Sequence, residues 1–148
     1  MMTRVVAFVM ASAALIVPGL GPVVAQEPQC SGGQCVKHLT VQAGRSIVMA
    51  PGITFVSAAP ACEFLPPSIE TVKAAAQGRV VPKIVPRSVG GTLASGSPPG
   101  ACAGRPTKGL QLTYVANRNA TGSDEVILVA SVRGQPAVRA RYVITITP

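Results

Sequence analysis

The last forty residues alternate between apolar and other side chains with a period of two, and this pattern limits the fold more than any other feature. From Val138 to Ile146 every second residue is apolar, and Arg139 and Arg141 stand between them. The same alternation runs through 110–114 and 126–132, where both faces are mostly apolar in the second segment. Successive side chains of a strand point to opposite faces of a sheet, so these segments are predicted to be β-strands.

Shorter β-branched runs precede this region, and Gly and Pro turns separate them. They lie at 37–42, 46–49, 53–57 and 79–85. Pro82 restricts the last of these to the edge of a sheet, because proline cannot donate to a ladder. Residues 68–76 fit either a helix or a strand, and Thr71 and Val72 favour the strand. No segment has the pattern of a long amphipathic helix, so the sequence predicts an antiparallel all-β sandwich or barrel.

The first 25 residues have the pattern of a secretory signal peptide. Arg4 supplies the positive charge, 5–17 is an apolar run, and small residues occupy the cleavage positions. The run is too short to span a bilayer as a helix. We therefore expect a secreted or periplasmic protein with no transmembrane anchor in the mature chain. The rest is predicted to divide into a disulfide-pinned tail (26–36) and one domain (37–148).

All four cysteines follow the predicted signal peptide. An even number of cysteines in an exported chain predicts two disulfides. We favour Cys30–Cys35, because the Gly-containing insert between them can close a short loop, and Cys62–Cys102 as the second pair. The two other pairings stay open. A zinc site is disfavoured, because the spacings contain no CxxC pairs.

One motif in the second half resembles a known family. In 114–128, Tyr114, Gly122 and Asp124 match in type and spacing the C-terminal half of bacterial immunoglobulin-like (cadherin-like) domains of exported proteins. The family pattern is Tyr-x-Pro, followed by aromatic residues before and after Gly-x-Asp. In this chain Ala116 stands in place of the proline, and Ala120, Val126 and Leu128 stand in place of the aromatics. Residues 68–80 resemble the preceding strand and its turn, with Gly78 at the turn position.

The resemblance covers about residues 68–147. It implies an immunoglobulin-like β-sandwich and a non-enzymatic module. In that fold Gly122 would adopt a positive φ, Asp124 would cap the turn through backbone N–H groups, and Tyr114 would tie its hydroxyl to nearby backbone. A calcium role for Asp124 is the alternative, but only Glu125 is an adjacent carboxylate.

The sequence offers little to a catalyst. His38 is the only histidine, and no nucleophile elbow, zinc-protease motif or phosphate-binding glycine loop occurs. Glu63 and Glu70 could form a glycosidase pair, but the chain has no Trp to stack on a sugar. We therefore expect that the protein is not an enzyme and that it binds no cofactor and no metal. A small hydrolase that uses His38 is the weakest alternative.

The net charge of +8 suggests an anionic partner. The candidate contact residues are Lys73, Arg79, Lys83, Arg87, Arg105, Lys108, Arg139 and Arg141. Suitable partners are an anionic component of the cell envelope or an acidic protein. Export and the lack of interleaved aromatics disfavour nucleic acid, so we expect no nucleic-acid partner. A scattered, solubilising basic surface is the alternative.

These observations predict an exported, non-catalytic immunoglobulin-like module that binds or spaces something in the periplasm or at the cell surface. The alternative is a small secreted inhibitor or ligand-binding β-barrel that uses the Gly90–Arg105 loop, which is rich in Gly, Ser and Pro.

Overall fold

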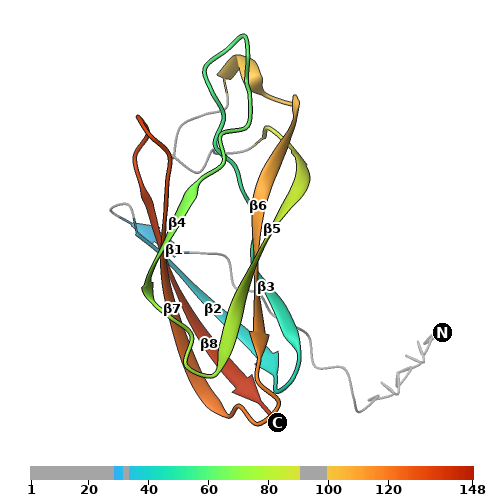
Figure 1. Cartoon of the computed structure of the whole chain (residues 1–148), viewed down its shortest axis with the longest axis vertical. Helices are drawn as coiled ribbons and strands as arrows, with labels where there is room; N and C mark the ends of the chain where they lie inside the picture. Colours follow the sequence, from blue (N-terminus) through green and yellow to red (C-terminus); the bar gives the residue numbers. More distant parts are fainter. Residues whose placement is uncertain (1–28, 32–33, 91–99) are drawn as a thin grey trace, which may run out of the picture.

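A computed structural model of the chain describes residues 29–31, 34–90 and 100–148, so the predicted signal peptide lies outside it. The described elements are strands and one short 3₁₀ helix (Figure 1). Their bounds are β1 Gln29–Ser31, β2 Gln34–Gln42, β3 Ser46–Ile53, β4 Ser68–Lys73, β5 Gly78–Ser88, the 3₁₀ helix η1 Gly100–Cys102, β6 Pro106–Ala116, β7 Gly122–Ser131 and β8 Val138–Thr147.

The strands form two sheets that face each other, which confirms the predicted all-β sandwich. The five-stranded sheet has the order β1-β2-β8-β7-β4, and the three-stranded sheet has the order β3-β6-β5. Figure 1 shows the two sheets as separate layers that cross at an angle.

One pairing differs from the antiparallel prediction. β2 runs parallel to β8 in an unbroken register from Gln34 opposite Arg139 to Gln42 opposite Thr147. The two strands come from opposite ends of the domain, so no hairpin forces them to be antiparallel. The remaining ladders are antiparallel.

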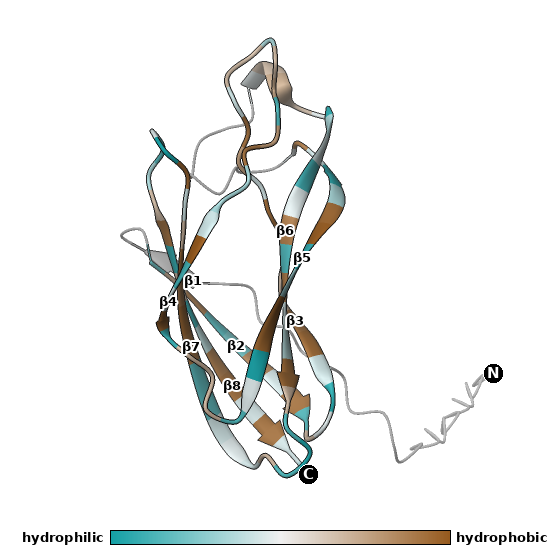
Figure 2. Cartoon of the chain, in the orientation of Figure 1, coloured by the Kyte–Doolittle hydropathy of each residue, from teal (hydrophilic) through white to brown (hydrophobic). Residues whose placement is uncertain are grey.

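The core lies between the two sheets and is built from every second residue of the long strands. In β6 the buried set is Leu110, Leu112, Tyr114 and Ala116, and in β8 it is Tyr142, Ile144 and Ile146. Figure 2 shows hydrophobic segments recurring along strands of both sheets. This regular burial follows from the period-two pattern of the sequence.

Part of the predicted tail at 26–36 is regular strand, because β1 pairs antiparallel with the start of β2. One predicted turn is wrong. Pro51 and Gly52 do not end a strand but lie inside β3, and 53–57 is not a strand of its own. Register shifts between Val48 and Ile53 mark irregular pairing with β6. β3 is also an edge strand, where a proline is tolerated.

The sequence placed two other elements correctly. Residues 68–73 are strand β4, which settles the ambiguous segment in favour of the strand. The strand that contains Pro82 is β5, at an edge of the three-stranded sheet, as predicted.

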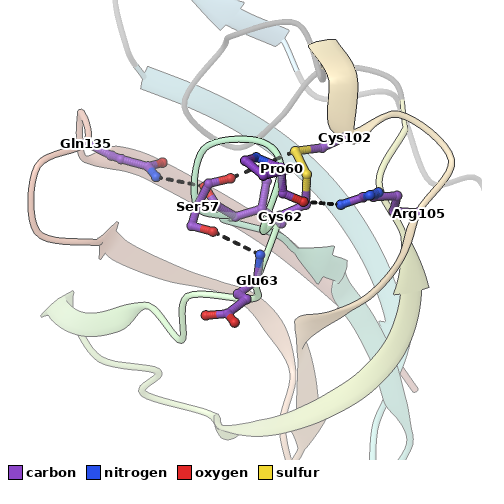
Figure 3. Close-up of a disulfide and its surroundings, with 8 residues drawn as sticks. Ser57, Pro60, Cys62, Glu63, Cys102, Arg105 and Gln135 are labelled. Atoms are coloured by element: carbon purple, nitrogen blue, oxygen red, sulfur yellow. Dashed lines mark hydrogen bonds between the residues drawn. A yellow bond between two sulfur atoms is a disulfide. The ribbon is translucent and has the colours of Figure 1, made fainter.

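The predicted Cys62–Cys102 disulfide is present. It joins the loop between β3 and β4 to η1 (Figure 3), and a second small buried cluster of Val56, Val89 and the two cysteines surrounds it. Cys35 is also disulfide-bonded, and the β1–β2 register places Cys30 opposite it. The side chain of Cys30 lies outside the described residues, so the Cys30–Cys35 pair stays a prediction.

Removing the long-range disulfide should destabilise the domain. The cysteines of this pair are 40 residues apart, and closing a loop of that length stabilises by about 4 kcal/mol in the chain-entropy model. We expect Cys62→Ala/Cys102→Ala to lower the free energy of unfolding by about that amount in urea titrations. A Cys30→Ala/Cys35→Ala variant, which opens a much shorter predicted loop, should lose about 2 kcal/mol. Equal losses would contradict this account.

Candidate functional site

The residues of the family-like motif meet at one end of the sandwich. Tyr114, fully buried in β6 of the three-stranded sheet, donates its hydroxyl to Asp124 Oδ2 at 2.7 Å. Asp124 lies in β7 of the five-stranded sheet and is only 6% exposed. This hydrogen bond therefore links the two sheets through the core. The tyrosine bonds a side chain here, not the nearby backbone that the tyrosine-corner interpretation suggested.

Asp124 fastens the connection between β4 and β5. Its Oδ1 accepts from the backbone N–H of Ala76 at 3.0 Å and of Glu125 at 2.9 Å, and its Oδ2 accepts from Gln77 N–H at 2.9 Å. Two of these donors belong to the β4–β5 connection, so Asp124 does not simply cap its own turn. Gly122 has a φ of +80°, as expected for the turn that leads into β7.

The hydrogen bonds keep the Asp124 carboxyl ionised. Burial alone would raise its pKa, but hydrogen bonds from Ala76, Gln77, Tyr114 and Glu125 outweigh burial and hold the pKa below its ordinary value. The pKa of Tyr114 is raised by burial and by the adjacent carboxylate. The Tyr114 hydroxyl and both carboxylate oxygens of Asp124 therefore have hydrogen-bond partners inside the fold, as expected for a structural role.

Gly78 completes this contact. A methyl group at Gly78 would lie 2.5 Å from the Val115 carbonyl oxygen and 2.6 Å from Tyr114 Cζ. Gly78 therefore lets the tyrosine ring pass directly against the start of β5. The side chain of the preceding Gln77 makes two more hydrogen bonds. Its Nε2 donates to Ser123 O, and its Oε1 accepts from Thr121 N–H, each at 2.9 Å.

The eight predicted cationic contact residues fall into three places. Lys73, Arg139 and Arg141 belong to the five-stranded sheet. Arg105 and Lys108 lie near the disulfide, where the Arg105 guanidinium donates to Pro60 O. Arg79, Lys83 and Arg87 lie on β5 of the three-stranded sheet and are exposed. The structure thus does not gather all eight in one patch.

The cations of the five-stranded sheet are partly neutralised. Lys73 Nζ lies 2.9 Å from Glu125 Oε1, and Arg141 Nε lies 2.7 Å from Glu125 Oε2. Hydrogen bonds from these two cations lower the pKa of Glu125. The carboxylate of Glu125 thus offsets one of these two positive charges, whereas β3, β5 and β6 contain no carboxylate.

The three cations of β5 face solvent on one side of their sheet. β5 pairs with β6 so that Arg79, Lys83 and Arg87 lie opposite Val115, Gln111 and Thr107. From Leu110 to Ala116 the buried residues of β6 are the even-numbered ones, so the odd-numbered ones face outward. The cations share this parity, and we call the surface they occupy the outer face of β3-β6-β5.

Arg87 lies across this outer face. A methyl group at Gly109 of β6 would lie 3.0 Å from Arg87 Cγ, and one at Gly52 of β3 would lie 2.9 Å from Arg87 Nε. The two glycines therefore leave a shallow track in which the arginine side chain crosses from β5 to β3. Val48 and Val81, each 40% exposed, lie on the same face on either side of Thr113.

No carboxylate belongs to this sheet. The sequences of β3, β5 and β6 contain no Asp or Glu. Of the acidic residues that the structure describes, Glu63 lies in the β3–β4 loop and the others lie in β4 and β7. The outer face of β3-β6-β5 thus carries positive charge without local compensation.

The candidates for catalysis lie apart. His38 is exposed on β2, Glu63 is in the β3–β4 loop, and Glu70 is on β4. Within the described ranges no cluster of three or more His, Cys, Asp or Glu residues could hold a metal ion.

The Gly90–Arg105 loop is described only at its ends, because 91–99 lie outside the described residues. Figure 3 shows the neighbourhood of its Cys102. Ser57 Oγ accepts from Glu63 N–H at 3.0 Å, and Gln135 Nε2 donates to Val56 O at 3.2 Å. The first bond lies within the β3–β4 loop, and the second ties that loop to the connection between β7 and β8; the disulfide joins the same loop to Cys102.

Sequence reasoning missed the glycine track under Arg87 and the inward direction of Lys37. Gly109 interrupts an alternating strand, which signals a close approach of another group. Lys37 shares its parity with the buried Leu39 and Val41, a signal that the sequence contains.

Comparisons with known proteins do not assign the chain to a family. No family model matches it, and no curated protein matches it. The solution structure of amebosin matches with a TM-score of 0.35 and 10% identity, covering 77% of this chain and 96% of amebosin. A likeness this low carries no argument. In the part of the chain that the structure describes, no helix has the length and apolar character needed to cross a membrane.

Proposed function

We propose that the chain is an exported, non-catalytic immunoglobulin-like module whose outer face of β3-β6-β5 binds a linear anionic polysaccharide of the cell envelope. The observation that carries the proposal is the line of Arg79, Lys83 and Arg87 on a sheet without carboxylates. Export is supported by the signal-peptide pattern and by the disulfides.

The spacing of the cations favours a linear polymer. Each is four residues from the next, so their backbones are about 13 Å apart along the strand. A chain with regularly placed anionic groups could follow β5 and meet all three. Unpaired surface cations attract polyanions over a distance of about one Debye length, roughly 8 Å at physiological salt.

The free edge of β5 is poorly suited to a different mode of binding, the addition of a strand. Pro82 and Pro86 interrupt this edge strand, and neither can donate a backbone hydrogen bond. Prolines and charged residues are common protection against strand addition at sheet edges. The face of the sheet is therefore the better candidate for contact.

Binding should depend on these three cations. We expect the Arg79→Gln/Lys83→Gln/Arg87→Gln variant to lose most of its affinity for dextran sulfate in isothermal titration calorimetry at low salt. The slope of log K against log salt should also become less steep by about two to three, because fewer counterions are released. The matched control is Arg118→Gln/Arg133→Gln/Arg139→Gln, which removes the same charge elsewhere.

The control separates a specific face from a generally basic surface. If both triple variants lose affinity equally, the scattered-charge reading is correct and the proposal is wrong. Uncharged dextran should not bind either variant or the unaltered protein. Binding to anionic lipid vesicles with no binding to dextran sulfate would also contradict the proposal.

A further inference from the structure

A pocket of about 180 Å³ opens between the two sheets, at some distance along the strands from the Tyr114–Asp124 contact. Its walls are mostly apolar side chains from β3, β6, β7 and β8: Met49, Ile53, Leu112, Leu128, Ala140 and Tyr142. Its volume corresponds to about six water molecules. Apolar pockets of this kind take apolar ligands in place of water.

One cation belongs to this apolar lining. Lys37 has the same parity in β2 as the buried Leu39 and Val41, so its side chain points between the sheets. Its ammonium donates to the backbone carbonyl of Met49, on the opposite sheet, at 3.0 Å. An ammonium group has three N–H donors, so this bond satisfies one of them.

The charge of Lys37 has no partner within the described protein. Both ion pairs of the described residues involve Glu125, on the outer face of the other layer. Burial lowers the pKa of Lys37, which reflects the cost of holding a charge in this partly apolar setting. A bound anion beside the ammonium would reduce that cost.

From this geometry we propose that the pocket binds a short- to medium-chain aliphatic carboxylate, with its alkyl chain between the sheets and its carboxylate on Lys37. The apolar walls match the chain, and the ammonium matches the head group. A cationic head would be repelled by Lys37, and a neutral head would leave the ammonium without a counter-charge. This site is separate from the outer face of β3-β6-β5 and does not rest on the function proposed for it.

The test uses the full chain with its disulfides formed and follows binding of octanoate that carries ¹³C in its carboxyl group. We expect saturable binding by NMR and calorimetry. Affinity should rise from butanoate to octanoate by about fourfold per methylene until the pocket is full. Octanol, with the same alkyl chain and no charge, should bind more weakly than octanoate.

Two variants distinguish the head from the chain. Lys37→Met should weaken octanoate at least tenfold and leave octanol binding unchanged, because only the charged contact is lost. Lys83→Met is the matched control, with the same change in net charge on the opposite face, and should bind octanoate as the unaltered protein does. Ala140→Leu should weaken octanoate and octanol alike by filling the pocket.

The proposal is overturned if the unaltered protein shows no saturable octanoate binding. It is also overturned if Lys37→Met binds octanoate as tightly as Lys83→Met, or if Ala140→Leu leaves affinity unchanged. ¹H–¹⁵N spectra establish that each variant is folded before its affinity is measured. The octanoate titration of the unaltered protein can refute the proposal on its own, even if the Lys37→Met protein does not fold.

Discussion

Replacing Asp124 with alanine is expected to lower the free energy of unfolding by about 4 kcal/mol. The carboxylate accepts hydrogen bonds from three backbone N–H groups and from the buried Tyr114 hydroxyl. Each donor left without a partner costs about 1–3 kcal/mol where water cannot replace the acceptor. Partial access of water near Ala76 keeps the total below the sum of the largest values. Urea unfolding followed by circular dichroism measures this loss.

Two milder variants act as controls. Tyr114→Phe removes only the cross-sheet hydroxyl and should cost about 1–2 kcal/mol. Asp124→Asn keeps one oxygen acceptor and should cost less than alanine. If Asp124→Ala were as stable as the unaltered protein, Asp124 would not fasten the β4–β5 connection.

The same carboxylate should give a pH dependence. Because the folded pKa of Asp124 lies below its ordinary value, its contribution is present above the unfolded pKa and is lost as pH falls through the folded pKa. We expect the free energy of unfolding to fall below about pH 4. The fall should be smaller in Asp124→Asn. Glu125 titrates in both proteins, so the difference between them isolates Asp124.

Replacing Gly78 with alanine is expected to cost about 3 kcal/mol or more. The added methyl would lie within 2.7 Å of the Val115 carbonyl oxygen and of two atoms of the Tyr114 ring and hydroxyl. The backbone oxygen cannot move without disturbing the β5–β6 ladder, so overpacking here cannot relax cheaply. Thermal and urea unfolding would report the loss.

Gly90→Ala is the matched control for this prediction. A methyl group at Gly90 would meet nothing within 4 Å, so the same chemical change should alter stability by less than about 0.5 kcal/mol. Comparable losses in the two variants would show that the clash with Tyr114 is not the cause. Combining Gly78→Ala with Tyr114→Leu should cost less than the sum of the two single losses, because the added methyl then no longer meets the ring.

The two-layer β architecture could be predicted because the sequence alternates with a period of two, and the sandwich buries every second residue of its long strands between the sheets. The alternation in 138–146 places Tyr142, Ile144 and Ile146 in the core and Arg139 and Arg141 near the surface. The edge position of β5 could be predicted from Pro82 alone, because proline has no backbone N–H to donate to a second neighbouring strand. Loop length and compartment favoured the Cys62–Cys102 disulfide.

Other features depend on contacts between distant segments. β2 pairs in parallel with β8 because it adds to the side of β8 that β7 does not occupy. No local sequence pattern encodes this pairing. Pro51 is typical of a turn, but β3 continues to Ile53 because its pairing with β6 becomes irregular around the proline. The three backbone partners of Asp124 could not be assigned, because two of them come from a connection nearly fifty residues away.

The candidate contact surface was predictable in its residue types but not in its arrangement. The sequence supplied eight cations, and only the fold separates those compensated by Glu125 from the uncompensated line on β5. This separation gives the two layers different roles in our account. The five-stranded sheet holds the ion pairs, and the three-stranded sheet presents the charge.

The most direct test of that account is an NMR titration of ¹⁵N-labelled protein with dextran sulfate. The account predicts saturable, salt-sensitive shifts at Arg79, Lys83 and Arg87 and at their outward neighbours in β6, Gln111 and Thr113, with little change in β2 and β8. Shifts concentrated on the five-stranded sheet or on the disulfide-bonded loops, or no shifts at low salt, would contradict it.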